Sequence, residues 1–302
     1  MSSVRILGGN DGIGGLILAF QCAHFAKKIN DSVEIVISAR DDCYNPLFYL
    51  FGDDFNINKA SEQDTSNDEI LKNFVLITKY TSDVDNFYYV SPDCIFRNRF
   101  VFDFIKYKVN LNIVKSERLL QNKFNPQLNH VYVGLISSTR EYIYQDLQKL
   151  LIELGSLLDN CIIHCPIIKN WAGHELNYNL DKSKIPSNVV IYENPNLLEQ
   201  IDLLSKCYYG IYTDNGMSHI AYQFGQARLL LDYRFGCSRN SLPWISRWRE
   251  TTEESIRFET DSNTIARIVK TNLEIPQTLL IPRSYVSNNI GEDWGRELLF
   301  KY

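Results

Sequence analysis

The second half of the chain alternates short apolar runs with amphipathic segments of helical period, and this alternation limits the fold more than any other feature. The predicted strands are residues 130–137, 161–168, 189–192, 209–213 and 228–231, and the predicted helices are 141–158, 197–207 and 217–224. Strands that alternate with helices normally form a parallel sheet with helices on its faces. The sequence therefore predicts an α/β domain here, with a polar loop at 169–187.

The first half begins in the same way. Residues 4–7 read as a strand, 8–15 as a glycine-rich loop and 16–28 as a helix. Further predicted elements are a strand at 33–38, a helix at 46–51 and a strand at 74–78. We expect a loop or a disordered insertion at 56–68, and the aromatic stretch 80–104 has no clear assignment.

A polar stretch at 122–129, which contains Pro126, separates the two series of elements. A chain of 302 residues has room for two domains. We therefore predict one Rossmann-like domain at 1–128 and a second at 129–282, followed by a C-terminal segment at 283–302. Ligands of such sheets bind at the carboxyl ends of the strands, so we expect a cleft between the domains.

Composition excludes several classes of protein. The formal net charge of −5 argues against a nucleic-acid partner, because such interfaces depend on clustered Lys and Arg. The seven cysteines are an odd, scattered set, which favours free thiols over a disulfide framework or a metal site. We find no secretory signal and no apolar run of about 18 residues, so we predict a cytoplasmic protein without a membrane span.

The strongest local motif lies between the strand at 209–213 and the helix at 217–224. Asp214 and Asn215 make a turn, Gly216 permits close approach of a ligand, and the helix directs free N–H groups toward it. This arrangement predicts an anion site. The alternative is that Asp214 or Asn215 only caps the helix and that His219 only packs against the sheet.

The stretch Thr-Asp-Asn-Gly-Met-Ser-His-Ile-Ala, residues 213–221, resembles the Asp-Thr/Ser-Gly-x-x-His motif of the lipopolysaccharide heptosyltransferases, a family with the two-domain GT-B fold. Asn215 stands where that family usually has Thr or Ser. The helix before the motif and the strand and glycine loop after it, residues 225–236, are also similar. The resemblance implies that the donor diphosphate is lined by Asp214, Asn215, Gly216, Met217 and Ser218, with His219 beside it.

A second stretch, residues 134–141, resembles the strand that leads into Thr-Thr-Arg-Asp in the same family. Ser138, Thr139 and Arg140 can donate to phosphate oxygens, and the guanidinium would offset charge on the leaving nucleotide. The family usually has a Lys where this chain has Ile143. The alternative is a capped helix with an exposed arginine.

The N-terminal glycine loop resembles the family's loop, in which an Asp after Gly-x-Gly is the catalytic base. Alignment places Gly15 at that position, so Asp11 in the same loop is our candidate for the base that takes the proton of the acceptor hydroxyl. The alternative for Asp11 is an Asx turn. The glycines of this loop that we assign to the site are Gly9, Gly12, Gly14 and Gly15.

Two further segments are open to two interpretations. The loop at 170–179 places Trp171, His174 and Glu175 where they could hold the donor base or sugar, but one Trp could equally anchor an exposed loop. The segment 233–249 combines four Arg with two Trp, which suits either a nucleotide or a surface cover.

The sequence thus predicts a GT-B glycosyltransferase that moves a sugar from a nucleotide-sugar donor to the hydroxyl of a glycan or glycolipid acceptor. The family implies inversion, no metal and no cofactor, acceptor recognition by the N-terminal domain, and return of residues 283–302 to that domain. We expect at most peripheral membrane contact. Two alternatives stay open: a nucleotide-sugar epimerase or hydrolase, and a non-catalytic nucleotide-sugar-binding protein.

Overall fold

The structure is a computed structural model. It describes residues 4–8, 13, 16–17, 20, 23–24, 27, 32–37, 41–60, 75–77, 99–104, 109–115, 118–136, 144, 146–171, 174–175, 180–213, 215–232, 253–257 and 260–274. The chain divides into two compact units, Met1–Leu119 and Leu120–Tyr302. The sequence placed this division between residues 128 and 129. Leu120 falls in the second unit, where its N–H donates to the carbonyl of Gln223.

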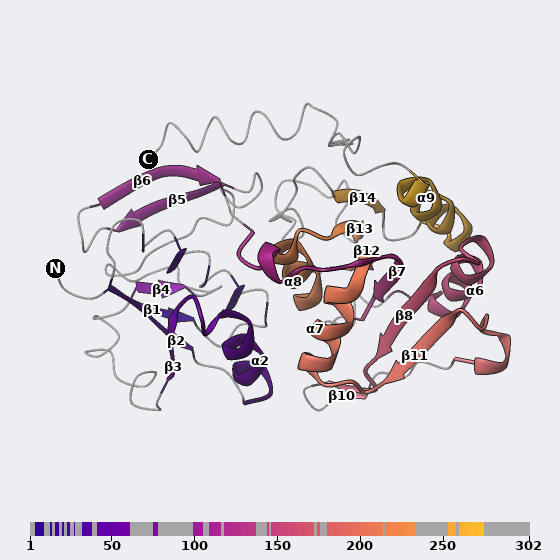
Figure 1. Cartoon of the computed structure of the whole chain (residues 1–302), viewed down its shortest axis with the longest axis horizontal. Helices are drawn as coiled ribbons and strands as arrows, with labels where there is room; N and C mark the ends of the chain where they lie inside the picture. Colours follow the sequence, from indigo (N-terminus) through magenta and orange to yellow (C-terminus); the bar gives the residue numbers. More distant parts are fainter. Residues whose placement is uncertain are drawn as a thin grey trace. The chain divides into compact units, whose positions relative to one another are not determined.

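The first unit contains a parallel sheet in the order β3-β2-β1-β4 (Figure 1). Its strands are β1 (Val4–Gly8), β2 (Val33–Ile37), β3 (Asn56–Lys59) and β4 (Val75–Ile77). An antiparallel pair, β5 (Arg99–Phe104) and β6 (Val109–Lys115), belongs to the same unit. The predicted strands at 4–7, 33–38 and 74–78 are therefore confirmed.

Helical residues follow β1, as the spacing of apolar positions predicts. The described residues of this segment are helical, and Leu16, Ile17 and Phe20 are buried. The ring of Phe20 stacks on Phe51 with the centroids 4.1 Å apart. Phe51 is the last residue of helix α2 (Asp41–Phe51), so aromatic packing joins the two helical segments of this unit.

The expectation of a loop at 56–68 is wrong for residues 56–59, which form the edge strand β3. Ile57 is the only buried position of this strand, and its neighbours are exposed. One of them, Asn58, donates from its side chain to Glu34 on β2 over 2.7 Å. An edge strand needs few apolar residues because only one side of it is paired, so its composition resembles that of a loop.

The second unit contains a six-stranded sheet in the order β11-β8-β7-β12-β13-β14, in which every pairing is parallel. The strands are β7 (Gln127–Gly134), β8 (Ile162–Ile167), β11 (Val189–Glu193), β12 (Cys207–Tyr212), β13 (Ala227–Asp232) and β14 (Glu253–Arg257). The strand order reverses direction between β7 and β12, which makes this a doubly wound sheet.

Four helices belong to the described part of this unit: α6 (Leu147–Leu157), α7 (Leu197–Lys206), α8 (Gly216–Phe224) and α9 (Ser262–Glu274). Apolar residues of α6 and α9 join one buried cluster with Val131, Val133 and Ile211 of the sheet. Side chains alternate along a strand, so Tyr132 and Tyr212 lie on the opposite face. On that face the Tyr212 hydroxyl donates to Gln226, whose amide donates to Leu204 of α7.

Tyrosines and glycines interleave at the centre of this second face. Tyr132 on β7 pairs in register with Gly210 on β12, and Tyr212 pairs with Gly134. A Cβ at Gly134 would lie 2.8 Å from the Tyr132 ring and 2.9 Å from the Tyr212 ring. The two rings stack with their centroids 5.6 Å apart. The glycines are therefore required because each tyrosine ring occupies the space beside the partner strand.

The predicted strands and helices of the second half are confirmed as elements, with three differences. Strand β7 runs over Gln127–Gly134 instead of 130–137, so it begins within the polar stretch that was predicted to separate the domains. Helix α6 begins at Leu147 instead of residue 141, since Tyr144 is not helical and bonds through its hydroxyl to the carbonyl of Thr260. The polar loop at 169–187 contains the short hairpin of β9 (Asn170–Trp171) and β10 (His174–Glu175), and the turn η4 (Lys182–Lys184). The sequence did not anticipate β14 and α9.

Candidate functional site

The candidate site lies where β7 and β12 end side by side. These neighbouring parallel strands end at Gly134 and Tyr212, which pair in register. Beyond them the chain continues to helices on opposite faces of the sheet, α6 after β7 and α8 after β12. In doubly wound sheets this switch in direction leaves a crevice at the carboxyl ends of the strands, where ligands bind.

Asn215 joins the two strand ends. Its Oδ1 accepts the N–H of Ser218 over 3.0 Å, which caps helix α8. Its Nδ2 donates to the carbonyl of Gly134 over 2.6 Å and to that of Ile136 over 3.0 Å. Both N–H groups of the amide are thereby used within the chain. The sequence named Asn215 as a residue that lines the donor, whereas in the structure its side chain connects α8 to the segment that leaves β7.

The first turn of α8 presents the positive end of a helix. Ser218 directs its hydroxyl to the carbonyl of Asn215 over 2.7 Å, and its N–H is capped. The N–H groups of Gly216 and Met217 have no acceptor within the helix, as at every helix N-terminus. The first turn contains no acidic residue. An anion at this position would therefore face the helix dipole with no carboxylate of the first turn opposing it.

Arg228 on β13 supports this turn from the sheet. Its side chain is 2% exposed, and its Nη1 donates to the carbonyl of Ser218. Its guanidinium lies 5.2 Å from the centre of the Tyr222 ring. A buried guanidinium fixes the first turn and adds positive charge on its sheet side. Arg228 has no role in the prediction from sequence, although a charged residue within an apolar strand was a visible signal.

Thr213 carries the second polar group that sequence reasoning missed. It follows the end of β12, is 1% exposed, and its hydroxyl has no hydrogen-bond partner among the described residues. A buried hydroxyl without a partner is unfavourable by about 1–3 kcal/mol. A group outside the described residues, whether a ligand, a water or another part of the chain, is expected to complete this hydrogen bond.

Of the predicted site residues, five are described, and all of them lie at the start of α8: Asn215, Gly216, Met217, Ser218 and His219. Met217, Ser218 and His219 are buried, while Asn215 and Gly216 are partly exposed. The other predicted residues lie outside the described residues, namely Asp11, Gly9, Gly12, Gly14, Gly15, Ser138, Thr139, Arg140 and Asp214. The segments 233–249 and 283–302 lie outside them as well.

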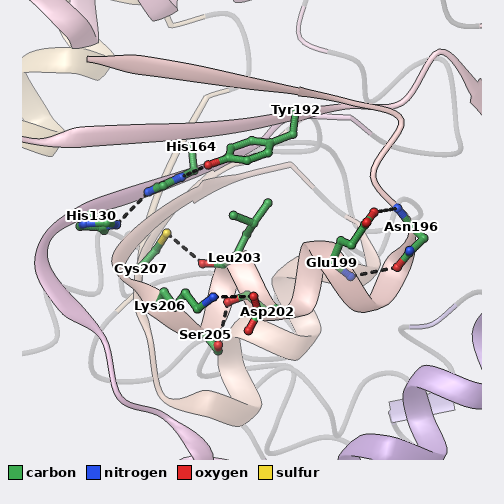
Figure 2. Close-up of polar contacts among 10 residues, drawn as sticks. All are labelled: His130, His164, Tyr192, Asn196, Glu199, Asp202, Leu203, Ser205, Lys206 and Cys207. Carbon is green, nitrogen blue, oxygen red and sulfur yellow. Dashed lines mark hydrogen bonds and ion pairs between the residues drawn. The ribbon is translucent and has the colours of Figure 1, made fainter. Parts of the chain in front are cut away.

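Helix α7 also begins at the carboxyl ends of the strands, but its N-terminus is capped by its own side chains. Asn196 accepts the N–H of Glu199 over 2.9 Å, and the Glu199 carboxylate accepts the N–H of Asn196 over 2.7 Å (Figure 2). This capping box places a negative charge at the positive end of the helix. The N-terminus of α7 is thus neutralised by its own side chain, whereas no described residue places a negative charge in the first turn of α8.

A chain of hydrogen-bonded rings lies on the sheet near α7 (Figure 2). His164 bonds to Tyr192 on β11 and to His130 on β7, each over 2.8 Å. Burial, and to a smaller extent the charges of His130 and Lys206, lowers the pKa of His164 to about 4. His164 is therefore neutral at pH 7, where one ring nitrogen donates and the other accepts.

Neither a metal cluster nor a membrane helix is found in the described part of the chain. Its His, Cys, Asp and Glu side chains form no group of three or more that could hold a metal ion. None of its helices is long and apolar enough to cross a membrane.

Comparison with known proteins identifies the fold. A scan of protein-family models finds no match, and a search of curated proteins finds none either. The E. coli heptosyltransferase WaaC, solved with ADP, matches with a TM-score of 0.59 and 7% identity over 90% of this chain and 100% of its own. The E. coli ADP-heptose lipopolysaccharide heptosyltransferase II gives 0.58 and 8%, over 90% and 98%.

The iron-containing, dodecameric glycosyltransferase TibC of enterotoxigenic E. coli gives a TM-score of 0.48 and 13% identity over 76% of this chain. The chain spans 60% of the length of TibC. At the identities of WaaC and heptosyltransferase II, the likeness concerns the fold and not the substrates. The chain therefore has the GT-B fold of these glycosyltransferases, built from two Rossmann-like units.

Proposed function

We propose that this protein is a glycosyltransferase that moves a sugar from a nucleotide-sugar donor to an acceptor hydroxyl. The observation that carries the proposal is the N-terminus of α8, which lies at the strand switch, has no acidic residue in its first turn and is fixed by Asn215. Such a helix end stabilises the charge of a diphosphate through its N–H groups and its dipole. The fold shared with a heptosyltransferase solved with ADP supports the same assignment.

In this proposal the donor diphosphate lies against the backbone N–H groups of Gly216 and Met217. Ser138, Thr139 and Arg140, which follow β7 in the sequence, supply further donors. Asp214 and His219 complete the set that the resemblance implies. The buried guanidinium of Arg228 contributes to the positive field without leaving the sheet.

The reaction we propose forms one C–O bond and breaks another. The acceptor oxygen attacks the anomeric carbon, Asp11 takes the proton of the acceptor hydroxyl, and the bond to the nucleoside diphosphate breaks. The helix end and Arg140 offset the charge that develops on the leaving diphosphate, in the role that a metal ion has in other enzymes. Attack on the face opposite the leaving group inverts the configuration.

The acceptor in this proposal is a glycan or glycolipid, and the reaction takes place in the cytoplasm. The decisive experiment incubates the protein with ADP-, GDP-, UDP- and CDP-sugars in the presence and absence of candidate acceptors. We expect a nucleoside diphosphate to be released only when an acceptor is present. Asp11→Asn should abolish transfer while nucleotide binding, measured by calorimetry, is retained.

Other outcomes would identify the alternatives. Release or isomerisation of the sugar without any acceptor would indicate a hydrolase or an epimerase. Binding without any reaction would indicate a nucleotide-sugar-binding protein, an interpretation favoured by Gly15 at the position where the family has its base. A protein that is folded but binds none of the four nucleotide-sugars would contradict all three assignments.

A further inference from the structure

We propose that Asn215 is a positioning residue, which sets the spacing between the two stretches of chain that hold the donor phosphates. The inference rests on the proposed function and makes it more specific. It assigns the donor contacts to the backbone of α8 and to the segment after β7, and it removes the side chain at position 215 from the list of direct contacts.

The amide of Asn215 has the contacts that this role requires. Gly134 is the last residue of β7, and Ile136 lies two residues beyond it, so the two acceptors are carbonyls of alternate peptides at the point where the chain leaves the strand. The same side chain caps α8 through Ser218. One planar group of fixed size therefore sets the distance between the exit of β7 and the first turn of α8.

A hydroxyl at this position could not do the same. Thr and Ser cap helices well through their oxygen, but they have one O–H donor and a shorter side chain. They could not donate to both carbonyls while accepting the N–H of Ser218. The resemblance places Thr or Ser here in the heptosyltransferases, so this chain has an amide that bonds to two elements where the family has a hydroxyl.

The test substitution is Asn215→Thr, which keeps the capping oxygen and introduces the family's hydroxyl but removes both N–H donors. We expect the Kd for the nucleoside diphosphate that binds best among ADP, GDP, UDP and CDP to rise about tenfold or more. Calorimetry at a temperature far below the unfolding transition gives this value. An unchanged or lower Kd would overturn the inference, because it would mean that the hydroxyl is as good as the tether.

Two control substitutions separate positioning from capping and from stability. Asn196→Thr makes the same change at the cap of α7, where the described side-chain bond stays within the first turn. Asn188→Thr removes an amide that donates to the carbonyls of Gly155, Leu158 and Cys161. Asn188 directly precedes β11, so it lies at the amino ends of the strands, away from the proposed site. We expect both variants to lower the unfolding temperature and to leave the Kd unchanged.

If either control lost as much affinity as Asn215→Thr, the loss would be a consequence of general destabilisation, and the inference would be overturned. If Asn215→Thr does not fold, Asn215→Ser, with a smaller capping residue, should show the same loss of affinity. Failure of the wild-type protein to bind any of the four diphosphates would overturn the donor site itself. Binding by the wild type with full retention in Asn215→Thr would overturn only the role of Asn215.

Discussion

Helices α7 and α8 cover the same face of the sheet in the second unit. They differ in how their N-termini are capped and in which side chains of the sheet lie near them. Helix α7 closes its N-terminus with its own Glu199, and the chain of hydrogen-bonded rings around the buried His164 lies near it. Helix α8 has no acid in its first turn and is tied to β7 by Asn215, above tightly packed tyrosines and glycines. Two β-α units of the same kind thus differ in the way that the proposed donor site requires.

Of the two helix ends, only the N-terminus of α8 has the features that the proposed nucleotide site requires. The polar groups of the α7 end bond to one another within a single turn. At the α8 end the capping side chain also bonds to the chain that leaves a different strand, and the first turn has no carboxylate that would oppose an anion. A binding site needs both features, because its elements must be held in place by contacts that do not use the N–H groups meant for the ligand.

The largest effect is expected from Gly210→Ala, among the interleaved tyrosines and glycines at the centre of this face. The added methyl group would overlap the ring and hydroxyl of Tyr212 and the side-chain oxygen of Gln226. Overpacking of this kind lowers the free energy of unfolding by about 3 kcal/mol. Urea unfolding measures the loss. Val190→Ala, on the partly exposed outer strand, should lower the free energy of unfolding by less than about 1 kcal/mol. Equal losses of stability in the two variants would refute the difference in packing between the centre of the sheet and its outer strand.

The second prediction concerns Gly216→Glu, which gives α8 the acid that α7 has. A carboxylate in the first turn would occupy the positive end of the helix and repel phosphate. We expect the Kd for the nucleoside diphosphate to rise about 100-fold, or about 2.8 kcal/mol, while stability stays within about 0.5 kcal/mol. The control is Leu198→Glu, in the first turn of α7, where the side chain is 41% exposed. That variant should bind nucleotide normally, and a similar loss there would remove the distinction between the helices.

These two predictions also mark how far the sequence could lead. The alternation of strands and helices and the glycine turn at Gly216 are local patterns, and they predicted the sheet and the start of α8. The tether could not be predicted, because Asn215 bonds to carbonyls 81 and 79 residues earlier in the chain. A helix cap is visible in sequence, whereas the second partner of the capping side chain depends on which strands become neighbours.

Other differences have a similar cause. Strand β3 was missed because an edge strand with one buried residue, Ile57, has the composition of a loop. Arg228 was assigned no role because its acceptor is a carbonyl on another element. The catalytic role of Asp11 and the phosphate contacts of Ser138, Thr139 and Arg140 stay predictions, since those residues lie outside the described parts of the chain.

The third prediction is that the free energy of unfolding depends on pH through His164, in the chain of rings near α7. The lowered pKa of His164, about 4 against an ordinary value of 6.5, means that the unfolded chain binds this proton more readily than the folded one. The stability from neutral His164 is therefore complete above pH 6.5 and declines as the pH falls from 6.5 toward 4. The slope from one proton is at most about 1.4 kcal/mol per pH unit, and solvent near this site makes it smaller.

Urea unfolding at pH 7 and pH 5 would test this, with His164→Asn compared at both values. The variant should lose less stability than the wild type between the two, because it lacks the titrating ring beside His130 and Tyr192. Equal losses would show that His164 is not responsible. Gly216→Glu, which changes the first turn of α8, should keep the wild-type pH dependence and serves as the matched control.

The smallest effect is expected from Glu199→Gln at the N-terminus of α7. Gln keeps an oxygen that can accept the N–H of Asn196, so the capping box survives and only the negative charge is lost. Removal of an exposed charge from a helix end costs about 0.5 kcal/mol in unfolding free energy, and this difference should shrink as salt is added. Nucleotide affinity should not change. If Glu199→Gln altered the Kd as strongly as Gly216→Glu, the N-terminus of α7 would belong to the binding site, and the distinction on which the donor assignment rests would fail.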